Sequence, residues 1–134
     1  MSITTKNIDY PLDRRLFSLP ITELPLNRRQ QLSGALNVEQ IIVAENGLCR
    51  DFRGVVQQLK LPYAEIAKLE RMIDPFGTLL SYGLVASELG SVGALLQLIA
   101  NIGRFDVLDD LVPGLVDDLE HLEGRRAAGV KTGE

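Results

Sequence analysis

The sequence predicts an all-α domain, and three observations carry that prediction. Leucine is the commonest residue, and apolar residues recur at helical spacing while strand-like alternation with polar residues is rare. Capping residues, prolines and glycines stand at the ends of these apolar runs, where helices begin and end. The 134 residues, 46% of them hydrophobic, suffice for one packed core. We therefore expect six helices joined by short turns in a single bundle.

The N-terminal part of the chain predicts an arm followed by the first helix. The first 25 residues contain three prolines and are expected to form an extended segment or short turns. The first helix covers residues 26–36, with Leu32 and Leu36 on one face, and an asparagine follows as a stop. Residues 38–50 hold the apolar run Ile41-Ile42-Val43 and then a turn, and the pattern leaves open whether a short helix precedes that turn.

Start signals place the remaining helices. Each start is a side chain that can accept the first N–H groups of a helix, a proline at the first helical position, or both. The starts are Asp51, Pro62, Asp74-Pro75 and Ser91, and the helix after Asp74-Pro75 is expected to continue to Leu84. Apolar spacing that meets Pro113 and resumes predicts a last helical segment over residues 105–122, and residues 124–134 lack apolar periodicity and are expected to form a flexible tail.

Several classes of function lack their residues here. With only Cys49 and only His121, the chain has no internal disulfide and no thiolate metal cluster. No phosphate loop, dinucleotide fingerprint, HExxH or CxxC is present, so we expect neither an enzyme nor a cofactor. Apolar runs are shorter than the ~20 residues that cross a bilayer, and no signal-peptide pattern opens the chain. We therefore expect a soluble, cytoplasmic domain.

Charge divides the chain into two parts of opposite sign. Residues 1–73 carry ten Lys and Arg against eight Asp and Glu, whereas residues 74–134 carry four against ten. The acidic pairs Asp109-Asp110 and Asp117-Asp118 predict a solvated face, because adjacent helical residues point ~100° apart and cannot both reach one ion. An isoelectric point near 5.0, with no cluster of four or more basic residues, argues against binding of nucleic acid.

Five motifs then occur in a fixed order. They are Asp51-Phe52-Arg53-Gly54-Val55-Val56-Gln57-Gln58-Leu59, Ile66-x-x-Leu69-Glu70, Asp74-Pro75-x-Gly77-x-Leu79-Leu80, Ser91-Val92-Gly93-x-Leu95-Leu96-x-Leu98 and Gly103-Arg104-x-Asp106-Val107-Leu108. Together with Leu24–Asn37 they resemble a death domain, and more narrowly the death domains of the myeloid differentiation primary-response adaptor family, which links Toll and interleukin-1 receptors to their kinases.

The resemblance implies an organisation and a fold. Residues 1–18 would be an N-terminal arm, residues 19–123 the death domain and residues 124–134 the tail. The fold would be an antiparallel six-helix Greek-key bundle. Its core would include Phe52, Leu69, Leu80, Leu96 and Leu108.

The chain departs from the family pattern at five places. Phe52 stands where death domains usually carry a core tryptophan, and Gly83 stands at the place of a second tryptophan, with Tyr82 beside it. The connection at residues 38–50 is longer than in the family. Gln57 and Ala67 occupy two positions at which the family uses charged residues in its assemblies.

By the same resemblance, the chain is a signalling adaptor domain that is recruited to activated receptors at the plasma membrane. It would assemble head-to-tail with the death domains of Tube and Pelle or of interleukin-1-receptor-associated kinases, and self-association is possible. The alternatives are the death domain of a Tube-like scaffold or of such a kinase itself and, more remotely, a helix-turn-helix DNA-binding module.

The predicted partner interface combines a basic and an acidic set of residues. It comprises Arg28, Arg29, Tyr63, Glu65, Lys68, Arg71, Asp74, Arg104, Asp106, Asp109 and Asp110. Oppositely charged patches of this kind steer two copies into register more than they stabilise the contact. Two of these residues have a structural alternative: Arg104 can form an internal ion pair with Asp106 or Asp74, and Tyr63 can pack within the domain.

Overall fold

The computed structural model describes residues 7–132, and the side chains of residues 83–84 and 122–132 lie outside that description, as does the end of the expected tail at residues 133–134. Helices form all the regular structure over residues 7–132, which confirms the all-α prediction. They are the 3₁₀-helices η1 (Arg14–Ser18) and η2 (Ile21–Glu23) and the α-helices α1 (Leu26–Leu36), α2 (Phe52–Gln58), α3 (Tyr63–Glu70), α4 (Pro75–Leu80), α5 (Gly83–Leu89), α6 (Val92–Asn101) and α7 (Phe105–Thr132).

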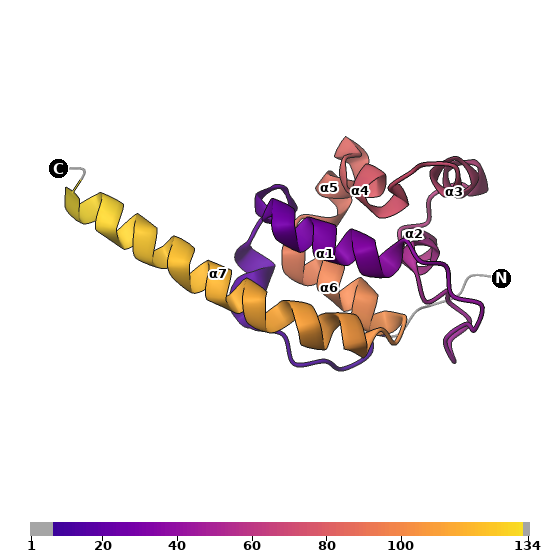
Figure 1. The fold of residues 1–134 in the computed structure, drawn as a ribbon, viewed down its shortest axis with the longest axis horizontal. Helices are drawn as coiled ribbons and strands as arrows, with labels where there is room; N and C mark the ends of the chain where they lie inside the picture. Colours follow the sequence, from indigo (N-terminus) through magenta and orange to yellow (C-terminus); the bar gives the residue numbers. More distant parts are fainter. Residues whose placement is uncertain (1–6, 133–134) are drawn as a thin grey trace.

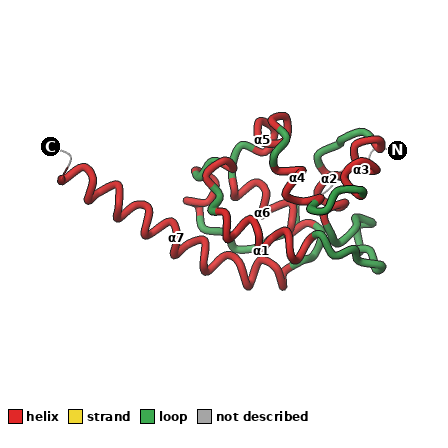
Figure 2. Tube along the Cα trace, turned by 45° about the horizontal axis from the view of Figure 1, so that its top comes forward, coloured by secondary structure: helices red, strands yellow, loops and turns green. Residues whose placement is uncertain are grey.

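The helices pack around α1 and α6. Helix α1 contacts α4 on one side and α7 on the other, and α6 contacts η1, α2 and α7. Figure 1 shows α1 and α7 side by side, with the C-terminal half of α7 extending beyond the rest of the molecule. Helix α3 lies at the opposite end, next to the long loop between α1 and α2 that is green in Figure 2.

The capping residues act as their sequence positions indicate. Asp51 accepts a hydrogen bond from the N–H of Arg53 at 3.0 Å, Asp74 from that of Gly77 at 3.0 Å, and Ser91 from that of Ala94 at 3.1 Å. Each bond satisfies an N–H group that the first turn of a helix leaves without a partner, so the three side chains fix where α2, α4 and α6 begin.

Two predicted elements differ in the structure. The helix expected from Pro75 to Leu84 is divided, because the chain turns extended at Tyr82 and a new helix, α5, starts at Gly83; the side chain of Leu84 lies outside the described residues. The expected flexible tail is helical up to Thr132, since α7 continues without interruption past Pro113. Alanine and arginine are good helix formers, and basic residues near a helix C-terminus are favourable, which explains this continuation.

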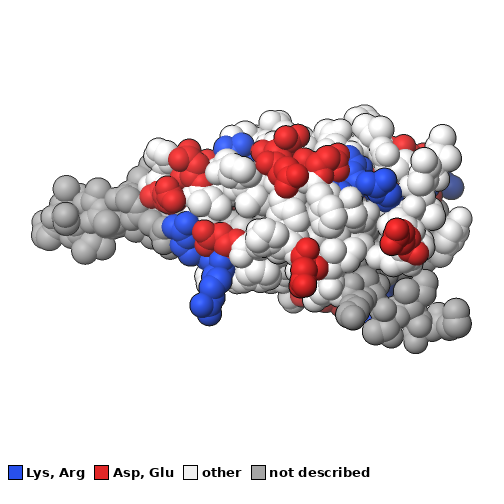
Figure 3. All heavy atoms as spheres, turned by 90° about the horizontal axis from the view of Figure 1, so that it is seen from below, with Lys and Arg blue, Asp and Glu red and all other residues white. Residues whose placement is uncertain are grey.

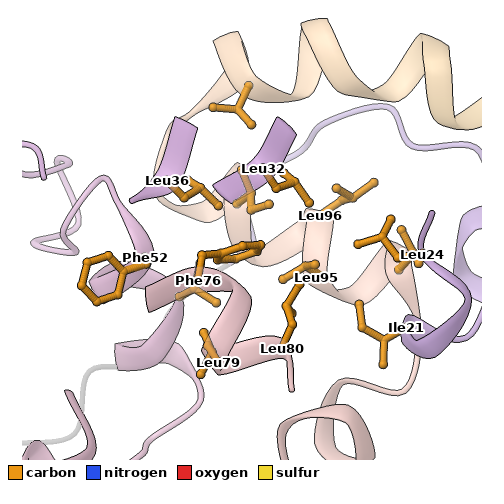
Figure 4. Close-up of a cluster of buried hydrophobic side chains, with 14 of the residues drawn as sticks. Ile21, Leu24, Leu32, Leu36, Phe52, Phe76, Leu79, Leu80, Leu95 and Leu96 are labelled. Atoms are coloured by element: carbon orange, nitrogen blue, oxygen red, sulfur yellow. The ribbon is translucent and has the colours of Figure 1, made fainter. Parts of the chain in front are cut away.

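The core lies between α1, α4 and α6. Figure 4 shows Phe76 at its centre, facing Leu32 and Leu36 of α1, with Leu95 of α6 beside it. The five residues predicted for the core are all buried: Phe52, Leu69, Leu80, Leu96 and Leu108. With no tryptophan in the chain, Phe52 and Phe76 are the largest fully buried side chains among the described residues.

The predicted N-terminal arm, residues 1–18, packs against this core through Tyr10, Leu12 and Leu16. Leu16 is fully buried, and the N–H of Ile8 donates to Asn101 Oδ1 at 2.8 Å. The backbone also pairs with the turn before α6, where the N–H of Val92 donates to the carbonyl oxygen of Leu19 at 2.8 Å. The sequence did not reveal this packing, because leucines in short 3₁₀ turns show no helical or strand periodicity.

Candidate interaction surface

One of the two predicted basic contacts on α1, Arg28, is engaged within the molecule. Arg28 Nε donates to Asp118 Oδ2 of the adjacent α7 at 2.8 Å, and this hydrogen bond raises the pKa of Arg28. Arg29 beside it is half-buried. The basic first helix and the acidic last helix therefore lie side by side, and Figure 3 shows basic side chains among the acidic ones on the face of the molecule that it presents. Arg28, which was predicted as a partner contact, is paired with Asp118 of the same molecule.

Arg104 is a structural residue and not an exposed contact. It is 8% exposed, and its guanidinium makes a two-pronged bond to Asp106, with Nε–Oδ1 at 3.0 Å and Nη2–Oδ2 at 3.1 Å. Its Nη1 also donates to the carbonyl oxygen of Arg50 at 2.7 Å. The hydrogen bonds from Arg104 lower the pKa of Asp106. The alternative of an internal ion pair is thus the one observed, and Arg104 joins the loop before α2 to the start of α7.

The other acidic residues at the start of α7 differ in their engagement. Asp109 accepts a hydrogen bond from the hydroxyl of Tyr10, whose ring stacks on Phe105 with centroids 5.6 Å apart. Burial, together with the bond to Asp109, raises the pKa of Tyr10 to about 12. Asp110 is exposed. Asp106 is also exposed, although its carboxylate binds Arg104. The N-terminal segment therefore forms a hydrogen bond with one of the three predicted acidic contacts, Asp109, which itself stays exposed.

The predicted residues on α3 remain at the surface. Tyr63 is 79% exposed, so it does not pack within the domain. Lys68 and Arg71 are exposed, and Glu65 is half-buried. We call Tyr63, Lys68, Arg71, Met72 and Ile73 the α3 corner; Ile73 is fully exposed, and Met72 is 37% exposed.

Asp74, which follows the α3 corner, has a structural role. It caps α4 and accepts a hydrogen bond from Asn37 Nδ2 at 2.7 Å, while Asn37 Oδ1 accepts from the N–H of Phe76 at 2.8 Å. Burial raises the pKa of Asp74, but the bonds from Asn37 and from the N–H of Gly77 outweigh it and keep this pKa below the ordinary value. These bonds hold the end of α1 against the start of α4.

A second exposed apolar segment was not predicted as a surface feature. In the loop after α1, Ile41 is 99% exposed, Ile42 75% and Val43 52%. The apolar run is visible in the sequence, but an apolar run alone does not distinguish a buried strand from an exposed loop. Contiguous exposed apolar patches mark surfaces that bind other proteins.

A pocket of about 500 Å³ lies where the N-terminal segment meets α7. Its apolar lining comes from Leu19, Pro25, Leu115 and Leu119. Its polar lining comes from Glu23, Asp118 and His121. No pattern in the sequence indicated this pocket, because its walls come from two ends of the chain.

The described residues were compared with the requirements of a metal site and of a membrane-spanning helix. Among the side chains that the structure describes, no three of His, Cys, Asp or Glu are placed so that they could hold a metal ion. Among the described helices, none is long and apolar enough to cross a membrane. No protein-family model matches the sequence, and no solved structure matches the fold. The features on which a function can be argued are therefore the α3 corner, the exposed loop and the pocket.

Proposed function

We propose that this chain is the death domain of a signalling adaptor, which recruits kinase-linked death-domain proteins downstream of Toll-type receptors in innate immunity. The ordered motifs support the proposal, and the residues that open three of them, Asp51, Asp74 and Ser91, each cap a helix. In this proposal α4 and α5 together take the place of the fourth helix of the Greek-key bundle. Helices α6 and α7 are then the fifth and the sixth.

The observation that carries the proposal is the exposed apolar and basic surface of the α3 corner. Tyr63 is 79% exposed at the start of α3, and Ile73 is fully exposed just after its end. Leaving such side chains in water gains nothing for the fold of an isolated domain, whereas aromatic and aliphatic anchors are what a protein interface buries at its centre.

The proposed mechanism is asymmetric assembly. If the α3 corner of one molecule binds a different surface of the next molecule, the contact is head-to-tail, and a rotation that does not close produces an open helix of subunits. Lys68 and Arg71 would orient the approach to an acidic partner surface, and each exposed pair contributes ~0–1 kcal/mol. We therefore expect kinase-linked death domains, such as those of the Pelle and Tube type or of interleukin-1-receptor-associated kinases, to join the assembly.

The proposal is tested by titrating the purified chain with a Pelle-type or Tube-type death domain in an isothermal titration calorimeter at low salt. We expect binding that weakens as salt is added, and a loss of at least tenfold in affinity for Tyr63→Ala and for Arg71→Glu. Arg14→Glu is the matched control, because Arg14 is an exposed arginine on η1, away from α3. Equal binding by the Tyr63, Arg71 and Arg14 variants, or no heat from any of these death domains, would contradict the proposal.

A further inference from the structure

The N-terminal strap, residues 7–10, is held on α6 through its backbone. The N–H of Ile8 donates to Asn101 Oδ1 at 2.8 Å, and the carbonyl oxygen of Ile8 accepts from Gln97 Nε2 at 2.9 Å. Gln97 and Asn101 stand one helical turn apart on the same face of α6, so the two side chains hold both polar groups of one residue. Main-chain hydrogen bonds of this kind give affinity for a peptide segment, and side-chain contacts add specificity.

Tyr10 supplies the side-chain contact, at the start of α7. Its ring stacks on that of Phe105 with centroids 5.6 Å apart, and its hydroxyl donates to Asp109. Phe105 is 39% exposed even with this ring on it, so departure of the strap would uncover a large aromatic side chain. We define the strap site as the residues that bind the strap and those that support them: Gln58, Gln97, Asn101, Phe105 and Asp109.

The strap site is also held by contacts that do not involve the strap. Asn101 is 1% exposed, its Oδ1 also accepts from Gln97 Nε2 at 3.0 Å, and its Nδ2 donates to Gln58 Oε1 at 2.9 Å. Gln58 Nε2 in turn donates to the carbonyl oxygen of Leu98 at 2.9 Å. Departure of the strap would remove the other two hydrogen bonds of the Asn101 side chain. The site therefore stays formed without its strap, and refilling it restores hydrogen bonds to a buried amide.

The strap can leave without opening the fully buried core. Its four residues are exposed or half-buried, and the first fully buried residue of the described chain is Leu16. Between them, Asp13 caps η1 by accepting from the N–H of Arg15 at 2.9 Å, which holds the turn that carries Leu16. The exposed Pro11 directly follows the strap, so movement there leaves η1 in place.

We infer that the strap site also receives the strap of a second copy of this chain. The same residues meet whether the strap comes from its own chain or from another, and such an exchange of identical elements is a low-cost route to dimers. A strap attached to its own chain has an effective concentration on the order of mM, so exchange occurs between copies that are concentrated to that range. The contact goes beyond the proposed function, because it needs a second copy and no kinase-linked partner.

Two complementary variants of the full chain test the exchange. The first carries Ile8→Pro and Tyr10→Ala, which remove the N–H and the ring of the strap and leave the strap site intact. The second carries Gln97→Ala and Phe105→Ala, which damage the strap site and leave the strap intact. All four residues are at least partly exposed, so the fully buried core is unchanged.

In the mixture, Phe105 is present only in the first variant and Tyr10 only in the second. A nuclear Overhauser effect between these two rings therefore arises only between copies, and we expect it at about 1 mM of each variant. Adding Gln97→Ala to the first variant should weaken the effect at least twofold, because the donor to the Ile8 carbonyl oxygen is lost. Adding Gln57→Ala instead is the matched control and should change nothing, because this exposed glutamine lies outside the strap site.

The unsubstituted chain gives a second measurement that does not depend on the folding of any variant. With half of the molecules ¹³C-labelled, the effect between a labelled Phe105 ring and an unlabelled Tyr10 ring should grow with concentration. Absence of this effect at 1 mM and above, or an effect in the mixture that Gln97→Ala leaves unchanged, would overturn the inference. Either result leaves the calorimetric test of the proposed function standing, since that test concerns the α3 corner.

Discussion

Asp51 joins the loop after α1 to the start of α2 through one buried carboxylate. The residue is fully buried, its Oδ1 accepts from the N–H and from Nε of Arg53, both at 3.0 Å, and its Oδ2 accepts from Arg53 Nη2 at 2.6 Å. Oδ2 also accepts from the N–H of Gln40 at 2.8 Å, which fixes the loop after α1 to the start of α2.

Replacing Asp51 by alanine removes this junction. Loss of the helix cap costs about 0.5–2 kcal/mol, and breaking a buried ion pair by removing one partner costs about 3–5 kcal/mol. These costs overlap, and the side chain of Arg53 is 24% exposed, so water partly replaces its lost partner. We therefore expect the free energy of unfolding to fall by about 3–4 kcal/mol and Tm to fall by roughly 10–15 °C.

The contribution of Asp51 also depends on pH. Burial raises the pKa of Asp51, but the hydrogen bonds from Arg53 and Gln40 outweigh burial and lower this pKa below its ordinary value of 3.8. Because the folded pKa is below the unfolded one, the stabilisation is present above pH 3.8 and is lost as pH falls below that value. The Asp51→Ala variant lacks this part of the acid dependence.

Urea denaturation followed by circular dichroism measures the effect. Asp13→Ala is a matched control, because Asp13 caps η1 and pairs with Arg15 at 2.8 Å with the same spacing, at a more exposed site. Solvent screens that pair, so we expect a much smaller change in stability for Asp13→Ala than for Asp51→Ala. Equal losses for the two variants, or a loss under ~1 kcal/mol for Asp51→Ala with an unchanged m-value, would refute the reasoning.

Four further variants test other parts of the structure. A Cβ at Gly54 would collide with a backbone carbonyl oxygen, whereas a Cβ at Gly34 meets nothing within 4 Å. In urea denaturation we therefore expect Gly54→Ala to lower the free energy of unfolding by at least ~2 kcal/mol and Gly34→Ala to raise it by about 0.5–1 kcal/mol. In absorbance titration at alkaline pH, Tyr10→Phe should remove the tyrosine that ionises near pH 12. Because the pKa of Tyr10 is raised only in the folded state, the stability of the unsubstituted protein should fall as pH rises above 10. Asn101→Ala should remove the protection of the Ile8 amide in hydrogen exchange, because Asn101 Oδ1 is its acceptor; unchanged protection would show that the N-terminal segment is held by other contacts.

The sequence was sufficient for the helices that local chemistry specifies. Asp51, Asp74 and Ser91 could be identified as caps because a cap depends on residues only a few positions away. The division between α4 and α5 could not be predicted, because the apolar spacing continues through it while the backbone turns extended at Tyr82. The tail was underestimated for the reverse reason: it lacks apolar periodicity, yet its residues favour a helix.

The candidate site was less predictable, because pairing across the fold determines which charges are free. Arg28 and Arg104 have no local sequence signal that separates an exposed arginine from a paired one, and the structure pairs them with Asp118 and Asp106. Tyr63 was found at the surface, in agreement with one of its two predicted alternatives. The pocket needed the three-dimensional fold, since Leu19 and Leu115 belong to opposite ends of the chain.

Light scattering of the chain mixed with a Pelle-type or Tube-type death domain tests the central claim most directly. Asymmetric head-to-tail assembly predicts complexes that exceed a one-to-one pair and grow in mass with concentration, and it predicts that Tyr63→Ala prevents this growth. A mixture whose mass stays that of the separate proteins at every concentration, even at low salt, would contradict the account.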